Sequence, residues 1–353
     1  MFGNNGTNVL GEGAYGQVVV KNGLAVKSFK KLQHITQEYT ILRYLRDCNH
    51  VVKATHVDFT KLELSMDLYD SSLRIFLLGT KLNKEQQITC IKHLLYGLIE
   101  FHDRNLAHGD IKPGNLLIKK HPFRLVIGDC GFASVAKYAK VERTAEPYRD
   151  PEIAFHISHD IYSFGICLYE LSTGLRFRNH KDDAKKIKHY DQMVPLIEKN
   201  VKDKKHKFVL LNVLHPNKDG RMSARDILEY LYHESPKKWD KKSSVSLSYN
   251  HLDNEKVVRD LFKYTCYHFH INRSNKGYYS LLYYFHKHKI QKEDYVLYTC
   301  ATLILLASLF SSFEIKEQNI ISLSEEKYTN QEIHNIIYIL LQDDIFVDLL
   351  LSP

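Results

Sequence analysis

The sequence lacks the patterns of a secreted, disulfide-bonded protein. Its six cysteines stand singly, with no CxxC pair, and no signal peptide precedes them. We therefore expect a reducing environment and an intracellular location, which is cytoplasmic, nuclear or both. For the same reason we do not expect glycosylation of Asn272, although it begins an NRS triplet.

A concentrated stripe of basic residues is also missing. The net charge is +8, but the lysines are spread over stretches that look exposed. We therefore expect no direct contact with nucleic acid. Two lysine-rich segments within residues 185–207, KKIKHY and KDKKHK, are interpreted as a solvated insert, and recruitment of acidic substrates or nuclear import is the alternative.

One long uncharged run occurs, VLYTCATLILLASLFSSF at residues 296–313. Its eighteen residues lie at the lower limit of a membrane-spanning helix, and tyrosine, threonine and serine residues interrupt it. We interpret the run as a helix buried inside an all-helical domain, and we expect no membrane association. A membrane-tethered protein is the alternative.

The length and composition fit a globular chain of two domains. Hydrophobic residues make up 44% and charged residues 25% of the 353 positions, which excludes wholesale disorder. The segment PKKWDKKSSVSLSYN has the composition of a linker. We place one domain at residues 1–240, the linker at 241–250 and a second domain at 251–353. The second domain shows helical spacing without a strand pattern in four stretches, at residues 252–270, 276–289, 293–312 and 329–350.

The first domain begins with the pattern of a small β-sheet and a helix. Asn22 and Gly23 stand between two apolar strands and predict a hairpin with a two-residue turn. Apolar residues at helical spacing predict a helix within residues 32–46, and LELSMDLY at residues 62–69 predicts a further strand. From residue 83 onward helical patterns dominate.

A glycine loop, GEGAYGQV, lies between the first two strands. Gly11, Gly13 and Gly16 suit a flap whose backbone amides lie over phosphate groups. Such a string also arises by chance, so a flexible hairpin tip is an equal interpretation of the loop by itself. The following strand carries Lys27, whose ammonium group suits the α and β phosphates. Glu38 is the acid in the first turns of the next helix, and we expect it to hold Lys27 in place.

The segment LAHGDIKPGNLLI adds the residues that phosphoryl transfer requires. Asp110 is the candidate base for an attacking hydroxyl, and Asn115 is a candidate magnesium ligand. Asp129 follows an apolar strand fourteen residues later and is a second candidate ligand. Glycine loop, strand lysine, helix glutamate, DxxxxN and DxG in this order are hard to obtain by accident.

Together these motifs resemble a eukaryotic-type protein kinase domain over residues 1 to about 240. HGD stands for the family's HRD, DCG for its DFG and DPE for its APE. Asp160 in HDIYSFG resembles the buried aspartate of the large lobe, and Arg221 stands where the family pairs an arginine with the glutamate of DPE, Glu152. The resemblance implies an α+β two-lobed protein kinase fold, with a small β-rich lobe and a large helical lobe.

The resemblance also implies a protein serine/threonine kinase that uses ATP and Mg²⁺ on protein substrates. Lys112 in DIKPGN matches the serine/threonine type and joins Asp110, Lys27 and Glu38 as a catalytic residue. GEGAYGQV, YDSSLRIFL and EPYRDPE most resemble the cyclin-dependent kinase group. Arg149 resembles the arginine with which this group prepares its pocket for proline, which implies Ser/Thr-Pro target sites, and the group itself implies a place in cell-cycle control. The implied nucleotide contacts are Gly11, Glu12, Gly13, Ala14, Tyr15, Gly16, Val18, Ala25, Lys27, the gatekeeper Met66, the hinge residues Asp67 and Tyr69, and Leu117.

The sequence differs from the family at three arginine positions that concern regulation. The family binds an activation-loop phosphate with three arginines, and Gly109, Gln37 and Ser134 occupy their positions here. We therefore expect activity that does not require phosphorylation of that loop, with a catalytically silent pseudokinase scaffold as the alternative. Tyr15 resembles an inhibitory phosphorylation site, and Cys130 is interpreted as a smaller core residue.

The tail resembles a single cyclin box over residues 252–350, an all-α cyclin-like domain. The resemblance rests on LYTCATLILLASLF followed by EEKYTNQEIHNIIYILL. It implies an intramolecular contact with the small lobe that holds Glu38 inward. Leu309 and Ile337 replace the lysine and glutamate with which cyclins grip a kinase, so we expect an apolar docking surface. Recruitment of other proteins without an effect on activity is the alternative.

Overall fold

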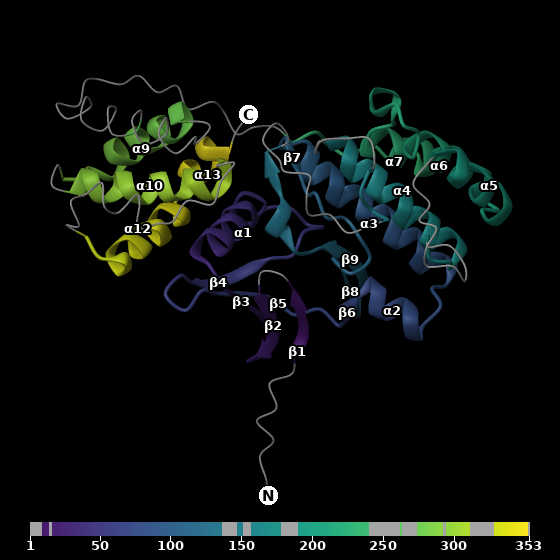
Figure 1. Cartoon of the computed structure of the whole chain (residues 1–353), viewed down its shortest axis with the longest axis horizontal. Coiled ribbons are helices and arrows are strands. Elements are labelled where there is room, and N and C mark those ends of the chain that lie inside the picture. The colour runs from purple at the N-terminus through teal and green to yellow at the C-terminus, as the bar shows by residue number, and fades with distance from the viewer. Residues whose placement is uncertain are drawn as a thin grey trace, which may run out of the picture. The chain divides into compact units, whose positions relative to one another are not determined.

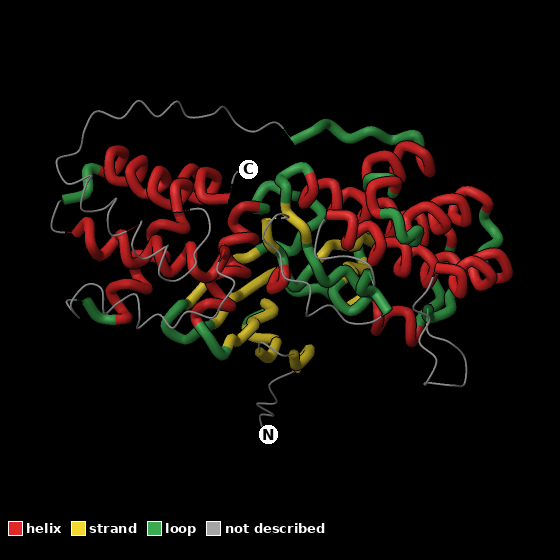
Figure 2. Tube along the Cα trace, turned by 45° about the horizontal axis from the view of Figure 1, so that its top comes forward, coloured by secondary structure: helices red, strands yellow, loops and turns green. Residues whose placement is uncertain are grey.

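The computed structural model describes residues 9–13, 16–135, 147–150, 157–177, 190–239, 262, 274–291, 294–310 and 328–351. The chain divides into two compact units (Figures 1 and 2). The first unit contains Met1–Arg46, Lys53–Leu68 and Lys241–Ser352. The second contains Asp47–Val52 and Tyr69–Asp240. The predicted linker at residues 241–250 lies outside the described residues.

The first unit is built on a five-stranded antiparallel sheet in the order β1-β2-β3-β5-β4. The turn between β2 and β3 is the predicted two-residue hairpin, because Asn22 and Gly23 have φ values of 51° and 76° and Lys21 pairs with Leu24. The prediction of this hairpin is confirmed. The strands are β1 (Val9–Gly13), β2 (Gly16–Lys21), β3 (Leu24–Phe29), β4 (Ala54–Asp58) and β5 (Glu63–Asp67).

Helix α1 (Leu32–Tyr44) begins three residues after β3 and lies inside the unit. It contacts strands β3, β4 and β5, and it also contacts helices α10 (Tyr295–Phe310) and α13 (Asp344–Leu351). Nine of its 13 residues are buried, more than the single apolar stripe of a surface helix. Figure 1 shows α1 between the strands and these C-terminal helices.

The C-terminal helices are arranged around α10, which contacts α9 (Ser274–His288), α12 (Asn330–Gln342) and α1. Fifteen of the 16 residues of α10 are buried. Its buried threonine and serine hydroxyl groups donate hydrogen bonds to carbonyl groups one turn earlier, so that these three groups need no partner outside the helix. These bonds are Thr299 to Tyr295 at 2.6 Å, Thr302 to Tyr298 at 2.9 Å and Ser308 to Ile304 at 2.8 Å.

The interpretation of residues 296–313 as a buried helix is confirmed over residues 296–310. Among the helices that the structure describes, none has the length and apolar character needed to cross a membrane. Leu309 and Ile337 are buried as well. The expected docking surface is not purely apolar, however, because Arg43 of α1 forms an ion pair with Asp344 of α13 at 2.5 Å.

The predicted helix at residues 329–350 is in fact two helices, α12 and α13, which break at Asp343. The carboxylate Oδ1 of Asp343 accepts hydrogen bonds from the backbone amides of Ile345 and Phe346, at 2.9 and 3.0 Å, and so caps α13. Neither glycine nor proline marks this break in the sequence. Of the predicted helix at residues 252–270, only Phe262 lies within the described part.

The second unit is mainly helical. Its central helix α4 is almost entirely buried and contacts α3, α6 and β7. Small antiparallel pairings, β6-β8-β9 and β10-β7, connect its loops; β7 contacts α4 and β9 contacts α3. The helices are α2 (Leu73–Gly79), α3 (Lys84–His102), α4 (Ile157–Thr173), α5 (Tyr190–Asn200), α6 (Lys204–Val213) and α7 (Ala224–Tyr232), with short 3₁₀ turns η1 (Cys130–Phe132) and η2 (Lys218–Gly220). The strands are β6 (Ser71–Ser72), β7 (Leu106–Ala107), β8 (Leu116–Lys120), β9 (Phe123–Ile127) and β10 (Ser134–Val135).

Close packing of α9 on α10 depends on Gly277. A Cβ atom at this position would lie 2.3 Å from Cδ1 of the fully buried Leu306. We expect Gly277→Ala to destabilise the first unit by about 1–3 kcal/mol, because overpacking outweighs the gain in helix propensity. The test is the midpoint of thermal unfolding, with Gly79→Ala as the control, since a Cβ there meets nothing within 4 Å. An unchanged or higher midpoint for Gly277→Ala would contradict this packing.

Candidate active site

The first part of the candidate site is the ion pair between Lys27 of β3 and Glu38 of α1. Lys27 Nζ lies 2.7 Å from Glu38 Oε2, and the two side chains are 9% and 1% exposed. The ammonium group also lies 5.1 Å from the centroid of the Phe29 ring. The expected ion pair is therefore present. Because it joins a strand to a helix, it forms only while α1 keeps its position on the sheet.

The predicted nucleotide contacts of the first unit lie on neighbouring strands. Val18 pairs with Lys27 across β2 and β3, and Ala25 pairs with Met66 across β3 and β5. Gly16 is required here for a steric reason, because a Cβ atom would lie 1.7 Å from the carbonyl oxygen of Ser28. Gly11, Glu12 and Gly13 lie on β1, and Asp67 ends β5. Ala14 and Tyr15 lie outside the described residues.

In the second unit, Asp160 of α4 holds the loop that follows β7. Its carboxylate accepts hydrogen bonds from the backbone amides of His108 and Gly109, at 2.7 and 2.8 Å, and His102 Nε2 lies 3.1 Å from it. Asp160 has no exposed surface. Burial acts to raise its pKa, but the bond from His102 and the other bonds outweigh it and hold the pKa below its ordinary value. Sequence reasoning missed His102, whose only signal is its place at the end of α3.

Gly109 has a φ of 80°, in the left-handed region that favours glycine. This conformation accompanies the hydrogen bond from its amide to Asp160. A side chain at this position would strain the backbone next to Asp110. In the sequence, Gly109 stands out only because the family has an arginine at this position. The structure adds a conformational reason for glycine.

His108 orders the same loop through its ring. Its Nδ1 accepts a hydrogen bond from the amide of Asp110 at 3.2 Å, and its Nε2 lies 3.0 Å from the carbonyl oxygen of Gly128. A carbonyl oxygen can only accept, so Nε2 carries the proton and Nδ1 the lone pair. The imidazole thereby connects the Asp110 loop to the segment just before Asp129.

Asp110 is 1% exposed and its two carboxylate oxygens differ. Oδ2 accepts hydrogen bonds from Lys112 Nζ at 2.6 Å and Asn115 Nδ2 at 2.8 Å. Oδ1 is buried and accepts no hydrogen bond from the described residues. Such an atom is costly unless a further donor reaches it. The arrangement therefore suits a carboxylate that is fixed by one oxygen and receives a proton on the other.

Asn115 and Asp129 lie at adjoining ends of β8 and β9. The amide of Gly128 donates a hydrogen bond to the carbonyl oxygen of Asn115 at 2.8 Å, which connects the two segments. Asp129 has a φ of 54° and begins the 3₁₀ turn η1. The amide group of Asn115 donates to Asp110 through nitrogen, so its oxygen is not used in these bonds. One amide oxygen and one carboxylate fit a hard divalent cation that also binds phosphates and water.

A larger metal site is absent from the residues that the structure describes, because no group of three His, Cys, Asp or Glu side chains converges there. The remaining predicted nucleotide contacts of this unit are Leu117 on β8 and Tyr69 before β6. The roles of all these residues stay predictions.

Arg221 is buried and forms an ion pair with Asp150. It also donates hydrogen bonds to the carbonyl oxygens of His215 and Ser158, at 2.9 and 3.2 Å. Its expected partner Glu152 lies outside the described residues. The described partner, Asp150, is the first residue of the DPE motif rather than its glutamate.

Replacing Asp160 tests whether it holds the loop. In Asp160→Asn one oxygen is lost as an acceptor and an NH₂ group faces backbone donors, so we expect a loss of about 2–4 kcal/mol in the free energy of unfolding. Urea unfolding measures this loss, with the exposed Asp219→Asn as control.

The pKa of Asp160 is lowered in the folded chain, so its contribution to the free energy of unfolding is present above the ordinary pKa of 3.8 and is lost as pH falls below that value. Equal stability of the two variants at neutral pH would contradict this role.

Residues 5–238 match the family model of the protein kinase domain. A probable cyclin-dependent serine/threonine-protein kinase of Dictyostelium discoideum is 29% identical over 189 residues, which cover 47% of this chain and 13% of the relative. The serine/threonine-protein kinase atg1 of the same organism is 30% identical over 167 residues, 43% of this chain and 25% of the relative. Mitogen-activated protein kinase p38b of Drosophila melanogaster is 29% identical over 194 residues, 47% of this chain and 53% of the relative.

The chain thus spans at most about half the length of these relatives. The sheet of the first unit and the helices of the second fit the fold of this family. A protein kinase domain in general uses ATP and a divalent metal ion. The two Dictyostelium relatives are named as serine/threonine kinases, in line with the predicted enzyme class. The chain belongs to the protein kinase domain family.

Proposed function

We propose that the chain is an ATP-dependent serine/threonine protein kinase that its own C-terminal domain activates. The observation that carries the proposal is the state of Asp110. One carboxylate oxygen is fixed by Lys112 and Asn115, and the other is buried without a hydrogen-bond donor among the described residues. A serine or threonine hydroxyl is the donor that this oxygen fits.

The proposed mechanism assigns one task to each residue. Asp110 Oδ1 accepts the proton of the substrate hydroxyl as the oxygen attacks the γ-phosphorus of ATP, while the bond from that phosphorus to the β–γ bridging oxygen breaks and ADP leaves. Lys112, 2.6 Å from Asp110 Oδ2, keeps the carboxylate oriented and adds positive charge beside the transferred group. Lys27 binds the α and β phosphates and is oriented by Glu38. Asn115 and Asp129 would hold Mg²⁺, which supplies charge neutralisation on the phosphates when bound.

The domain proposal keeps a kinase domain at residues 1–240, a linker at 241–250 and a cyclin-box-like domain at 251–353. Contacts of α1 with α10 and α13 support activation in cis. These helices cover the side of α1 that does not face the sheet, so they limit the ways in which Glu38 can move away from Lys27. Contact of the cyclin-like domain with other proteins, without an effect on rate, is the competing role.

We also propose that activity does not depend on activation-loop phosphorylation. Gly109, Gln37 and Ser134 offer no guanidinium group to a phosphate. The described end of the segment after Asp129 is held without one, because Ser134 and Val135 in β10 pair with Ala107 and Leu106 in β7. Backbone hydrogen bonds here take a task that phosphate contacts perform elsewhere.

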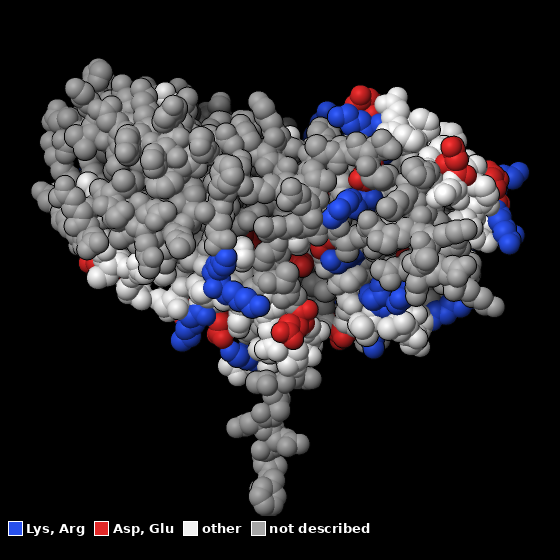
Figure 3. Space-filling view, viewed as in Figure 1, with Lys and Arg blue, Asp and Glu red and all other residues white. Residues whose placement is uncertain are grey.

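For the substrate we propose Ser/Thr-Pro sites, with Arg149 preparing the pocket for the proline. The name of one relative, a probable cyclin-dependent kinase, supports this group, and a role in cell-cycle control is part of the proposal. Nucleic acid is not proposed as a partner. On the face shown in Figure 3, basic side chains of the described residues alternate with acidic ones and form no single stripe. An intracellular location completes the proposal.

A scaffold without catalysis is the second candidate. The three missing arginines favour it, because pseudokinases need no ordered activation loop. In that case the kinase-like and cyclin-like surfaces would bind cell-cycle or transcription regulators. Phosphoryl transfer separates the two candidates.

The first test is Mg²⁺-dependent transfer of phosphate from ATP to matched peptides, one with Ser-Pro and one with Ser-Ala, by the full chain. We expect transfer that favours Ser-Pro, and a loss of about 10²–10⁴-fold in kcat for Asp110→Asn, which retains the shape but not the base. Asp219→Asn serves as the matched control. Transfer no faster than that of Asp110→Asn would reject the kinase in favour of the scaffold, and equal use of both peptides would reject proline direction.

Thr144 in the sequence VERTAEPYRDPE offers a test of phosphate independence. We expect phosphatase treatment and the variant Thr144→Ala each to leave kcat within about twofold of the untreated chain, because the three positions that bind the phosphate in the family hold no arginine here. The measurement compares untreated, phosphatase-treated and variant chains on the same peptide. A large rate increase after treatment with an activating kinase, absent in Thr144→Ala, would refute the proposal.

A further inference from the structure

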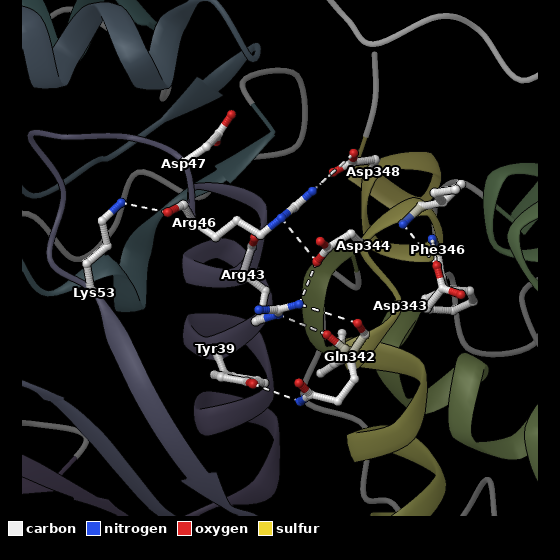
Figure 4. A network of polar contacts seen from close by, with 12 residues as sticks. Tyr39, Arg43, Arg46, Asp47, Lys53, Gln342, Asp343, Asp344, Phe346 and Asp348 are labelled. Atoms are coloured by element: carbon white, nitrogen blue, oxygen red, sulfur yellow. Dashed lines mark hydrogen bonds and ion pairs between the residues drawn. The ribbon is translucent and has the colours of Figure 1, made fainter.

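Helix α1 carries two functional faces. Glu38 points to Lys27, whereas Tyr39, Arg43 and the following Arg46 recur at intervals of four and three residues and so share another side. This second side faces the point where α12 ends and α13 begins, which we call the α12–α13 junction, residues Leu341–Asp344 (Figure 4). A movement of α1 that breaks one set of contacts therefore strains the other.

Arg43 donates hydrogen bonds to three acceptors of the junction. Its Nε donates to the carbonyl oxygen of Leu341 at 3.1 Å, and its Nη2 donates to the carbonyl oxygen of Gln342 at 3.4 Å and to Asp344 Oδ1 at 2.5 Å. The last carbonyl groups of a helix lack partners within the helix, and a planar guanidinium group can satisfy several of them at once. A lysine has the charge but not this fork.

Neighbouring residues add further contacts at the same place in the structure. Arg46 lies 3.2 Å from Asp348 through Nη1 and 3.1 Å from Asp344 through Nε. Gln342 Nε2 donates to the hydroxyl group of Tyr39 at 3.0 Å. Asp344 and Asp348 are one turn apart on α13, so one face of that helix is acidic where α1 is basic.

The junction is itself fixed from the opposite side. Asp343 is 8% exposed, and its Oδ2 receives hydrogen bonds from Lys287 at 2.7 Å and His288 at 2.8 Å, both on α9. Its Oδ1 caps α13. Asp343 therefore fixes the direction of the carbonyl groups and of Asp344, so that Arg43 meets a rigid partner rather than a mobile loop end.

We propose that Arg43 is a positioning residue of the kinase site, which fixes the rotation of α1, and with it Glu38 against Lys27, by binding the α12–α13 junction. This inference rests on the proposed function and names its regulation: the C-terminal domain acts on the site through a guanidinium fork. The ion pairs of Arg46 add to the affinity of the contact, and the carbonyl bonds of Arg43 set its geometry.

The test uses the full chain with Arg43→Met, which removes charge and fork, and Arg43→Lys, which keeps the charge. Lys21→Ala is the matched control, because it breaks an ion pair of the same unit, with Glu63 at 2.6 Å, away from this face of α1. We expect kcat to fall about tenfold in Arg43→Met, in the ordinary range of coupling between sites, with an unchanged KM for the peptide. Arg43→Lys should lie closer to Arg43→Met than to the unmodified chain.

Two readouts need no phosphoryl transfer and keep this inference separate from the proposed function. Hydrogen exchange should become faster in residues 32–44 as well as 330–351, and the Kd for ATP with Mg²⁺ should rise in Arg43→Met. If the unmodified chain transfers no phosphate, the proposed function fails while these two readouts still decide on Arg43. Faster exchange confined to residues 330–351, with kcat and nucleotide affinity unchanged, would overturn the inference and leave Arg43 a structural role only. Recovery of the full rate in Arg43→Lys would overturn the role of the fork.

Discussion

The position of α1 is the constraint on which the first unit depends. Lys27 and Glu38 are almost completely buried, and removing two charges from water costs several kcal/mol for each ion before their attraction is counted. An apolar pair of the same size would stabilise the fold at least as well. The retained ion pair is therefore better understood as a means of placing an ammonium group than as a source of stability. Its geometry is only as good as the placement of the helix that carries Glu38.

A thirteen-residue helix packed on one face has freedom to tilt and rotate. In this chain α1 is packed on two faces, because α10 and α13 contact it in addition to the sheet. Packing on α10, whose buried residues are mostly apolar, resists separation but tolerates sliding, since hydrophobic burial has no direction. Hydrogen bonds from Arg43 to carbonyl groups are directional, and they fix rotation. The two kinds of contact thus restrict different motions of the same helix.

The second unit must likewise hold its loop around Asp110 in place, and it does so through buried groups. Asp160 receives two backbone amides of the loop that precedes Asp110, and the ring of His108 connects this loop to Gly128. The carboxylate of Asp110 is then held by Lys112 and Asn115 from within the loop. Each contact leaves Oδ1 of Asp110 untouched. Order in this loop therefore comes from buried acceptors already present in the folded chain.

Local sequence signals predicted what depends on local physics. The Asn22-Gly23 turn and the buried helix at residues 296–310 follow from backbone preference and hydrophobic spacing, and the order of motifs predicted the Lys27 to Glu38 pair. Local sequence signals could not predict contacts between distant segments. Asp343 looks like any acid after a glutamine, and its role appears only in the structure, where Oδ1 caps α13 and the lysine and histidine of α9 hold Oδ2. The same holds for Gly109, whose φ of 80° accompanies a hydrogen bond to Asp160, 51 residues away.

Arg43 shows most clearly why such features escape sequence reasoning. Its three acceptors lie about 300 residues away along the chain, and two of them are backbone carbonyl groups that carry no residue identity. A pattern in side chains cannot reveal a partner that is main chain. It also follows that the contact constrains Arg43 more tightly than it constrains Leu341 or Gln342, since many residues can end a helix at that place. The specificity of the junction lies in its shape, in its last residue Asp344, and in Arg43, which binds both the carbonyl groups and this acid.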